Sequence, residues 1–497
     1  MRIQTSPIRP TLILLICLLA SSFTGVRTAS ADGGPGGSDL HIAQTLGDRE
    51  LTVVVRRVQG VPGPLRVDVV THTGTPPGRL TLRAIPVGAT ARVEDLPPAG
   101  STVSQGELVL GATAGYHGAT LRVDRPGPWE LVVDDGEQAA RIPFIVPAPV
   151  VSPPEFTAYA GFTAAGALLL GALGAAVWSR RRWTALVLAG GMVAAAAVGS
   201  TGALLSSVTP LPPQPGRELD PTMDNVVDPY AWTVPAVEYS RPPVNVRLRH
   251  GRTDAGRPVD LDLLLSDGAT GRPVDDLLVH DAALIHLVVV SPSGRLWHLH
   301  PIRVGAGHYR VRLTPAEKGR HAVTAELARR GGGVQLVRSP TGFDVDAGPP
   351  GTGAAPTPPG LGERDVNGTR VTLGATGLAA GTPTTVTARI GDTADLQPWL
   401  GMQGHLIVVG PLPDSDPVGD AAERAPVWAH AHSMAVTARG MADLPDETVA
   451  AFGPEVSFTF TFPMPGRYRV WVQAERDYTV LTVPALLTVE PEEGGTP

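Results

Sequence analysis

The chain has 497 residues, and its 58 glycines and 50 prolines make up about 22% of them, against roughly 12% in an average protein. Charged residues contribute 18% and the formal net charge is −7, which excludes a coiled coil and the basic surface that nucleic-acid binding needs. A hydrophobic share of 43% is too high for a wholly disordered chain. Lys318 is the only lysine, and this arginine-rich usage is typical of bacterial genomes of high GC content.

Residues 1–31 have the pattern of a secretory signal peptide. An arginine-bearing start precedes the short apolar stretch at residues 11–20, and a small-residue cleavage sequence ends at Ala31. An uncleaved anchor is the alternative, although the apolar stretch is short for a membrane span. Cys17 is the only cysteine, so cleavage would leave a mature chain with no disulfide and no thiolate metal site.

Residues 38–147 form the first expected folded module. Apolar and polar side chains alternate there in short runs, for example at residues 51–55, 80–85 and 129–133, and glycine and proline separate the runs. Many short strands joined by regular turns are typical of a β-sandwich. We therefore expect an Ig-like β-sandwich in this region.

Residues 156–178 and 184–208 are two uncharged stretches, each long enough to cross a bilayer. The arginines at 180–182 lie between them, and the positive-inside rule places this loop in the cytoplasm and the flanking modules outside. Neither stretch contains Asp, Glu, Lys, Arg or His, which favours an anchor over an ion path. Small residues recur every four positions, including Gly171 and Gly199, and favour close packing of the two helices.

Two further β modules are expected after the hairpin. A proline-rich linker at residues 209–241 leads to a module at residues 242–346, and a second linker at 347–364 leads to a module at 365–490. The two modules look like a divergent repeat. Both contain, in the same order, a strand with one histidine, a His-x-His strand, a further strand and a Gly-Arg turn. The predicted fold is thus mainly β, with three Ig-like β-sandwich modules and a two-helix transmembrane hairpin.

The histidines of this repeat are the candidate metal ligands. They are His286, His298 and His300 in the second module, and His405, His430 and His432 in the third. Neutral imidazole binds copper and zinc, and strand alternation places both histidines of a His-x-His pair on one face. The pairing register decides whether His286 shares that face, and the sequence leaves the register open. It also leaves open whether the two modules share one site.

Other residues near these motifs have less specific patterns. Met402 and Met434 flank the third module's histidines and could supply soft sulfur ligands for Cu(I), although ordinary core packing is the alternative. His308 and His321 are expected only as outer partners of the ligands. The remaining histidines are expected to be ordinary surface or turn residues: His41, His72, His117, His250 and His280. A structural cluster that hydrogen-bonds loop backbone is the alternative to a metal site.

The first module resembles the YtkA-like and FixH-like extracytoplasmic β-sandwich modules through its Leu-His-Ile-Ala-Gln-Thr segment at 40–45 and its Pro-Gly-Pro-Trp segment at 126–129. The later modules resemble secreted bacterial domains with a Gly-His strand, a His-x-His-Pro strand and a Pro-Gly-x-Tyr-Arg turn. Residues 298–301 and 465–469 match those motifs, whereas Ser433 replaces the proline in the third module. CopC-type copper carriers are similar in architecture. The resemblance implies copper handling outside the cytoplasm, with zinc as the second choice.

These patterns predict a membrane-anchored extracytoplasmic protein that binds, buffers or delivers copper and is not an enzyme. Its expected partners are a metal ion, the lipid bilayer and an envelope protein. The alternative is an envelope scaffold that binds a partner and uses its histidines structurally. A catalytic metal site is disfavoured, because it needs a general base and the sequence ties no carboxylate to the histidine strands.

Overall fold

The computed structural model describes these residues: 39–58, 60–87, 96–146, 151–209, 243–329, 333–338, 342–349, 358–413, 416–434 and 445–492. The predicted signal peptide, most of the first linker and much of the second lie outside the described residues. The chain divides into two compact units, one containing the helical hairpin and one containing the β modules.

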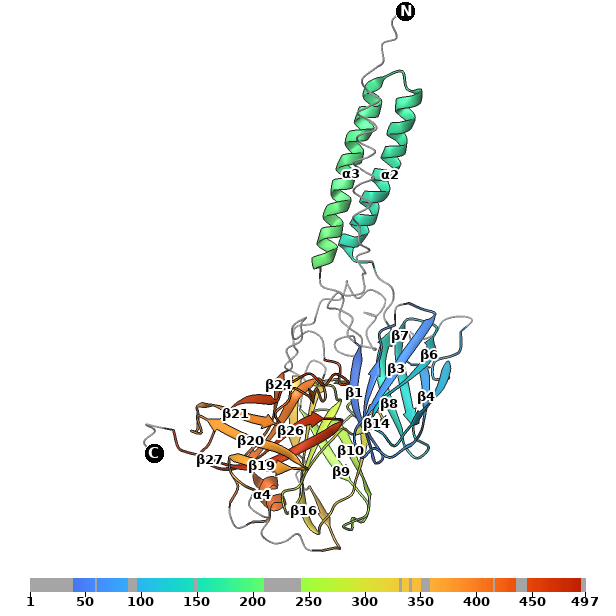
Figure 1. The fold of residues 1–497 in the computed structure, drawn as a ribbon. Helices are drawn as coiled ribbons and strands as arrows, with labels where there is room; N and C mark the ends of the chain where they lie inside the picture. The colour runs from blue at the N-terminus through green and yellow to red at the C-terminus, as the bar shows by residue number, and fades with distance from the viewer. Residues whose placement is uncertain are drawn as a thin grey trace, which may run out of the picture. The chain divides into compact units, whose positions relative to one another are not determined.

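The hairpin consists of α2 (Pro153–Trp178) and α3 (Arg182–Val208), which run side by side in opposite directions (Figure 1). Both helices are long and apolar enough to cross a membrane. The two backbones approach closely at Gly161 and Gly199, where a Cβ atom added to Gly161 would lie 2.5 Å from the Gly199 nitrogen. Gly171 instead meets a leucine side chain at an ordinary 3.6 Å. Close packing at small residues therefore occurs at Gly199 but not at Gly171.

The first module is a sandwich of two four-stranded antiparallel sheets, ordered β1-β2-β3-β6 and β5-β4-β7-β8. Its strands are β1 (Leu40–Leu46), β2 (Arg49–Val55), β3 (Gly63–Thr71), β4 (Gly78–Pro86), β5 (Ser104–Leu110), β6 (Gly115–Val123), β7 (Gly127–Asp134) and β8 (Ala139–Val146). Alternate side chains of both sheets face inward around the fully buried Trp129.

The second module has one sheet ordered β14-β15-β10-β9 and another ordered β11-β16-β12-β13, with β17 and β18 also paired to β16. Its strands are β9 (Val244–Arg249), β10 (Val259–Asp267), β11 (Leu277–Leu278), β12 (Ile285–Val290), β13 (Leu296–Leu299), β14 (Ile302–Gly305), β15 (His308–Leu313), β16 (Gly319–Arg329), β17 (Gly333–Arg338) and β18 (Phe343–Val345).

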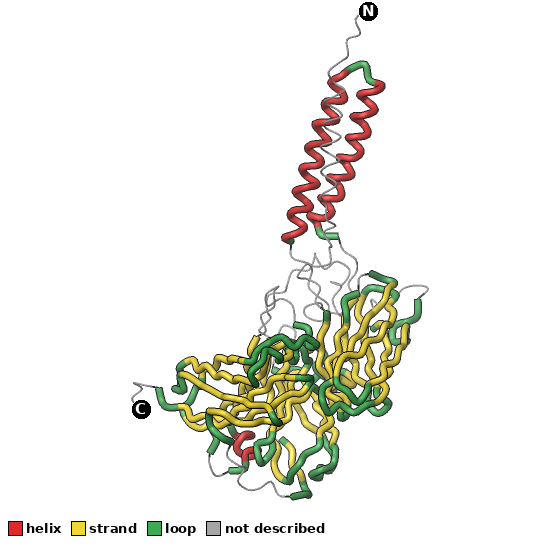
Figure 2. The backbone as a smooth tube through the Cα atoms, in the orientation of Figure 1, coloured by secondary structure: helices red, strands yellow, loops and turns green. Residues whose placement is uncertain are grey.

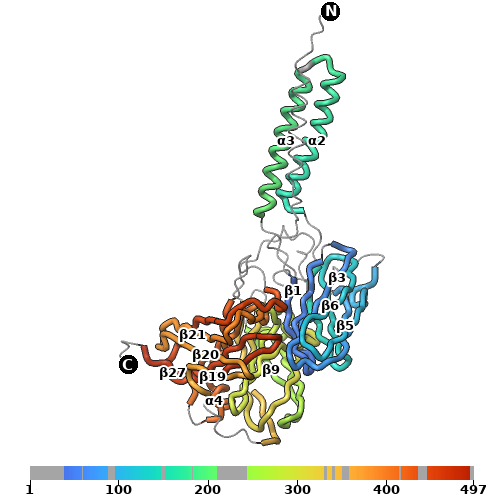
Figure 3. The backbone as a smooth tube through the Cα atoms, viewed as in Figure 1, coloured from blue at the N-terminus to red at the C-terminus, as the bar shows by residue number. Residues whose placement is uncertain are grey.

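The third module repeats this plan, with sheets ordered β19-β20-β21-β25 and β22-β26-β23-β24 and with β27 paired to β26. Its elements are β19 (Gly362–Val366), β20 (Thr369–Thr376), β21 (Pro383–Ile390), β22 (Leu396–Gln397), β23 (Met402–Gly410), α4 (Val418–Arg424), β24 (Val427–Met434), β25 (Glu455–Thr461), β26 (Gly466–Arg476) and β27 (Thr479–Val489). Strands dominate all three modules, and α4 is a short helix (Figure 2). Figure 3 labels α4 on the backbone traced from the N-terminal to the C-terminal end. The predicted fold class is confirmed.

Modules two and three pack against each other through one sheet of each. All six residues of β12 are buried, because Leu287 and Val289 face their own core while Val288 faces the other module. Val288 packs there with Ile407 of β23 and with Trp471 of β26. A strand covered on both faces has a continuous apolar sequence instead of an alternating one, and β12 and β23 both show this pattern.

The first module joins the same junction through its edge strand β1. The Ala43 nitrogen donates to the Ala282 carbonyl at 2.7 Å, and the Thr45 nitrogen donates to the His300 carbonyl at 2.8 Å. Ala43 and Ala282 are buried together with Leu400 of module three. All three modules therefore meet at the ends of the histidine-bearing strands.

Candidate metal centre

The strand register places the repeat histidines on the face that packs between modules two and three. In the second module Val288 lies opposite His298, so His286 shares the face of the His-x-His pair. In the third module His405 lies opposite His432. The register question that the sequence left open is thus answered in the same way in both modules.

Six imidazoles gather at this interface into what we call the histidine cluster. It consists of His286, His298, His300, His405, His430 and His432. Neighbouring ring centres lie 4.3 to 5.5 Å apart. His405 is fully buried and His286 is 1% exposed, whereas the His432 side chain keeps 14% exposure. The two modules share one cluster, so the sequence's second open question is also answered.

Two groups of three histidines within the cluster have nitrogens close enough to share an ion. His286 and His298 group with His430 of the other module, and His405 groups with His430 and His432. In each group, one nitrogen from every residue lies within 4.8 Å of the others. His430 belongs to both groups. His300 belongs to neither, although its ring centre lies 5.0 Å from that of His298.

In the paired rings, we call the nitrogen that faces another cluster ring the inner nitrogen and the other one the outer nitrogen. The outer nitrogens of His286 and His405 are hydrogen-bonded to backbone carbonyls. His286 Nε2 donates to the His280 carbonyl at 3.1 Å, and His405 Nε2 donates to the Trp399 carbonyl, also at 3.1 Å. His280 and Trp399 each begin a bridged turn, and each lies six residues before the cluster histidine of its module. A carbonyl oxygen only accepts, so in both rings the proton lies on Nε2 and Nδ1 keeps a lone pair.

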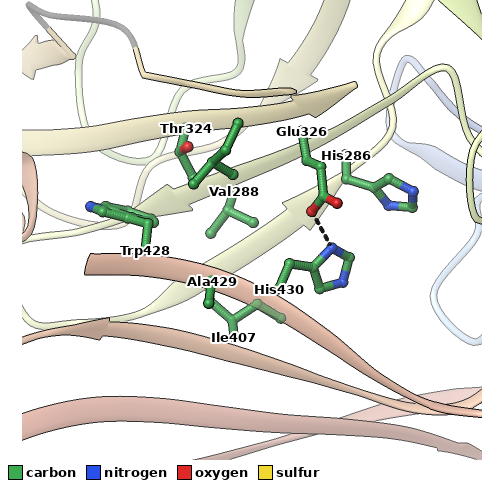
Figure 4. A pocket seen from close by; sticks show the side chains of 9 residues that line it. His286, Val288, Thr324, Glu326, Ile407, Trp428, Ala429 and His430 are labelled. Carbon is green, nitrogen blue, oxygen red and sulfur yellow. Dashed lines mark hydrogen bonds and ion pairs between the residues drawn. The ribbon is translucent and has the colours of Figure 1, made fainter. Parts of the chain in front are cut away.

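The outer nitrogens of the middle histidines are held across the module boundary. His298 Nδ1 donates to Gln473 Oε1 at 3.0 Å, and His430 Nδ1 donates to Glu326 Oε2 at 3.0 Å (Figure 4). Gln473 lies opposite His405 in its ladder, and Glu326 lies opposite His286. The contacts are reciprocal, as in an interface between two related halves.

The flanking histidines also have one nitrogen held by a carboxylate. His300 Nδ1 contacts Glu50 of the first module, and His432 Nδ1 lies 3.5 Å from Asp281 Oδ2. The Nε2 atoms of His300 and His432 are buried and have no hydrogen-bond partner. Outer acceptors of this kind fix the ring and the tautomer of metal-binding histidines.

The inner nitrogens face one another with lone pairs. His286 Nδ1 lies 3.2 Å from His298 Nε2, and His405 Nδ1 lies 3.1 Å from His430 Nε2. Because the outer acceptors hold the ring protons, neither pair has a proton to share while the rings are neutral. Two imidazoles on one ion place their nitrogens about 2.9 Å apart in square-planar geometry and about 3.3 Å apart in tetrahedral geometry, for metal–nitrogen bonds near 2.05 Å. The observed separations fall in this range.

Burial favours the neutral form of four of these imidazoles. Removal from water, reinforced by the neighbouring imidazoles, lowers the pKa of His286, His298 and His405 well below the ordinary 6.5. The same causes lower the pKa of His432 to about 4. Burial by itself would raise the pKa of Glu326, but its contacts with histidines hold that pKa below the ordinary range. These four imidazoles are therefore neutral beside the ionised Glu326 carboxylate near pH 7.

A small hollow of about 10 Å³, no larger than about one water molecule needs, lies beside the cluster between the two packed sheets (Figure 4). Ile407, Trp428 and other apolar side chains form its walls. His286, His430 and Glu326 line its polar end.

Four other sequence candidates lie in different settings. Met402 is 2% exposed and pairs with Met434, which is 41% exposed, at the end of the β23–β24 ladder. His308 bonds Asp262 at 2.8 Å on β10, and the His321 ring stacks on Phe343. The prediction that His308 and His321 act as outer partners of the cluster is therefore wrong. His308 and His321 follow the histidine strands in the order of the repeat, but their side chains contact Asp262 and Phe343 instead of the cluster.

Sequence reasoning missed the residues that hold the cluster in place. The expectation that no carboxylate is tied to the histidine strands is wrong, because Glu326 pairs directly with His286 in the sheet. His280, expected to be ordinary, groups with Asp281 and Glu326, and hydrogen bonds to these two carboxylates raise its pKa to about 9. An alignment of β16 with β26 could have paired Glu326 with Gln473. No sequence pattern pointed to Glu50 as a partner of His300, because Glu50 lies in the first module, outside the repeat.

Comparisons with known proteins find a family match for one part of the chain. A family model for a domain of unknown function (DUF8832) matches residues 364–491, which is the third module. No curated protein matches the chain at a significant level.

Solved structures with similar features include a tetra-tandem repeat from the extending region of a large adhesion protein, at 11% identity and a TM-score of 0.16, covering 88% of this chain and 74% of that one. The Escherichia coli adhesin FdeC is similar at 12% identity and a TM-score of 0.15, over 90% of this chain and 98% of its own. A membrane-anchored protein from Corynebacterium diphtheriae gives 8% identity and a TM-score of 0.14, over 88% and 90%. TM-scores this low carry no information on function.

Proposed function

We propose that this chain is a membrane-anchored metal-binding protein and that the histidine cluster binds a transition-metal ion, copper by preference. The observation that carries the proposal is the arrangement of the ring nitrogens. The outer nitrogens face protein acceptors, and the inner nitrogens of two pairs face each other as lone pairs at 3.1 and 3.2 Å. Facing lone pairs repel unless a cation lies between them, so this arrangement is unfavourable for a purely structural cluster.

The donor set favours copper. An all-imidazole site with no thiolate binds Cu(II) more tightly than the neighbouring divalent ions, following the general order of first-row metal affinities. Imidazole also suits Cu(I), and Met434 lies two residues beyond His432 on the same strand as a further soft ligand. Zinc is the second choice. The proposal places the β modules outside the cytoplasm, the hairpin in the membrane and the arginines at 180–182 in the cytoplasm.

A titration of the full chain in detergent micelles tests this proposal. We expect Cu(II), Cu(I) and Zn(II), each measured against a chelator of known affinity, to bind the wild type in the submicromolar range. The double variant His298→Asn/His430→Asn should bind at least about 100-fold more weakly, because it removes one inner nitrogen from each pair. The matched control is His250→Asn/His308→Asn, which removes two histidines outside the cluster. Wild-type affinity weaker than about millimolar for all three ions would overturn the proposal.

The second candidate function is an envelope scaffold that captures a partner protein. Three Ig-like modules joined by direct contacts suit that role. A scaffold needs no ion, so the His298→Asn/His430→Asn variant would keep its partner and no metal-dependent property would change.

A further inference from the structure

The two ends of the histidine cluster are related by the internal repeat but have different chemistry. The turn at residues 280–283 in module two corresponds to the turn at residues 399–402 in module three, because each closes with a bridge between its end residues. Each turn holds two successive residues at positive φ, Asp281 and Ala282 in one and Leu400 and Gly401 in the other. Equivalent backbones therefore present different side chains to the same cluster.

One end of the cluster is closed by apolar and packed groups. His300 is 1% exposed, and its backbone nitrogen and carbonyl both bond Thr45 of the first module at 2.8 Å. The Trp399 ring centre lies 5.2 Å from that of His298, and Trp399 is 2% exposed. The buried Leu400 completes this side. The Glu50 carboxylate, 22% exposed, contacts His300 at this end, but among the described residues no group of three donor atoms forms around it as one does at the other end.

The opposite end is polar and partly exposed to water. His280 takes the position of Trp399, Asp281 that of Leu400, and Glu326 that of Gln473. Side-chain exposures are 29% for His280, 20% for Asp281 and 13% for Glu326. These three residues could themselves hold an ion, because one donor atom from each lies within 4.8 Å of the others. We call them the access group.

The access group touches the cluster directly. Asp281 lies 3.5 Å from His432 Nδ1, and Glu326 accepts from His430 Nδ1 at 3.0 Å. The His432 ring centre lies 4.3 Å from that of His430, and its buried Nε2 atom has no hydrogen-bond partner. A continuous set of donors therefore runs from the partly exposed carboxylates through His432 to the buried imidazoles.

We propose that the metal ion enters and leaves the cluster at the His432 end, through a transient binding station formed by His280, Asp281 and Glu326. This inference rests on the proposed metal-binding function and adds to it the route by which the ion reaches the cluster. Carboxylates at the surface raise the local concentration of a cation and accept it while it still carries water. The imidazoles then replace that water as the ion moves inward.

The test gives the His432 end the residue types that are found at the equivalent positions of the His300 end. In the double variant Asp281→Leu/Glu326→Gln, the amide introduced on β16 can still accept from His430, as Gln473 does from His298, so the cluster stays supported. Single Asp281→Asn is a milder second variant. The matched control is Glu107→Gln, which removes a half-exposed carboxylate on β5 that pairs with Arg79, outside the cluster.

Association of Cu(II) is followed by stopped-flow quenching of tryptophan fluorescence in the full chain, because Trp399 lies 4.8 Å from His405 between ring centres. We expect association to slow at least about tenfold in Asp281→Leu/Glu326→Gln and severalfold in Asp281→Asn, and to stay within about twofold in Glu107→Gln. Equal rates in the wild type and both Asp281 variants, with tight equilibrium binding retained, would overturn the access route and leave the proposed function intact. Absence of binding to the wild type would instead overturn the function itself.

Discussion

Glu447 is a buried carboxyl whose removal should make the chain more stable in mildly alkaline solution. Glu447 is 3% exposed at the junction of modules one and three, and burial raises its pKa to about 7 from the ordinary 4.5. A buried acid whose pKa is raised in the folded chain contributes stability below its unfolded pKa and loses that contribution as pH rises through its folded pKa. The loss therefore falls between pH 4.5 and about 7.

The size of this loss follows from the two pKa values. A folded pKa of about 7 against 4.5 in the unfolded chain corresponds to roughly 3 kcal/mol at alkaline pH. Glu447→Gln imitates the protonated form at every pH. The variant should match the wild type at about pH 4.5 and exceed its free energy of unfolding by roughly 3 kcal/mol at about pH 8.

Urea unfolding of the full chain in detergent micelles, followed by tryptophan fluorescence at both pH values, measures the difference. Glu107→Gln is the control, because the Glu107 side chain is 51% exposed on β5 and should show no such pH dependence. If Glu447→Gln changed the free energy of unfolding equally at both pH values, the reasoning about a buried neutral carboxyl would be refuted.

Three other predictions concern the same β unit. His72 pairs with Glu475 at 2.5 Å, and although burial opposes it, this ion pair raises the His72 pKa to about 9. His72→Gln should therefore cost roughly 3 kcal/mol below pH 6.5 and almost nothing above about pH 9 in the same urea assay, and an equal cost at both would contradict this. Trp471→Ala should cost about 3–5 kcal/mol, because this fully buried side chain fills the interface of modules two and three, and a cost under about 1 kcal/mol would show that the interface does not need it. Copper at about 100 times its Kd should raise the unfolding free energy of the wild type by about 2.7 kcal/mol but leave His298→Asn/His430→Asn unchanged in thermal melts, and equal stabilisation of both proteins would place the ion elsewhere.

Local sequence determined the kinds of elements and their grouping into modules. Alternation of apolar and polar residues with period two, turn residues at regular intervals and two long uncharged stretches are properties of short segments. They predicted the sandwiches and the two helices without knowledge of contacts between segments. The side-chain period of a strand also placed each His-x-His pair on one face. These conclusions needed no long-range information.

The candidate site was only half predictable for a physical reason. The six cluster histidines could be named because they recur in a repeat, but their partners come from other strands and other modules. Glu50 lies about 250 residues from His300 in the chain, although the two side chains are in hydrogen-bond contact. No local pattern links them, because the link depends on how the first module docks.

The order of amino acids sets which residue types are present on each strand, and therefore which metal chemistry a site could have. Docking in three dimensions decided that modules two and three pack against each other through these strands, so that the histidines of both modules form one cluster. It also decided which end of that cluster is covered, because Trp399 and the first module close the His300 end while Asp281 leaves the His432 end polar. Burial, neutrality and access are consequences of docking between modules, and docking free energy is spread over side chains far apart in the sequence.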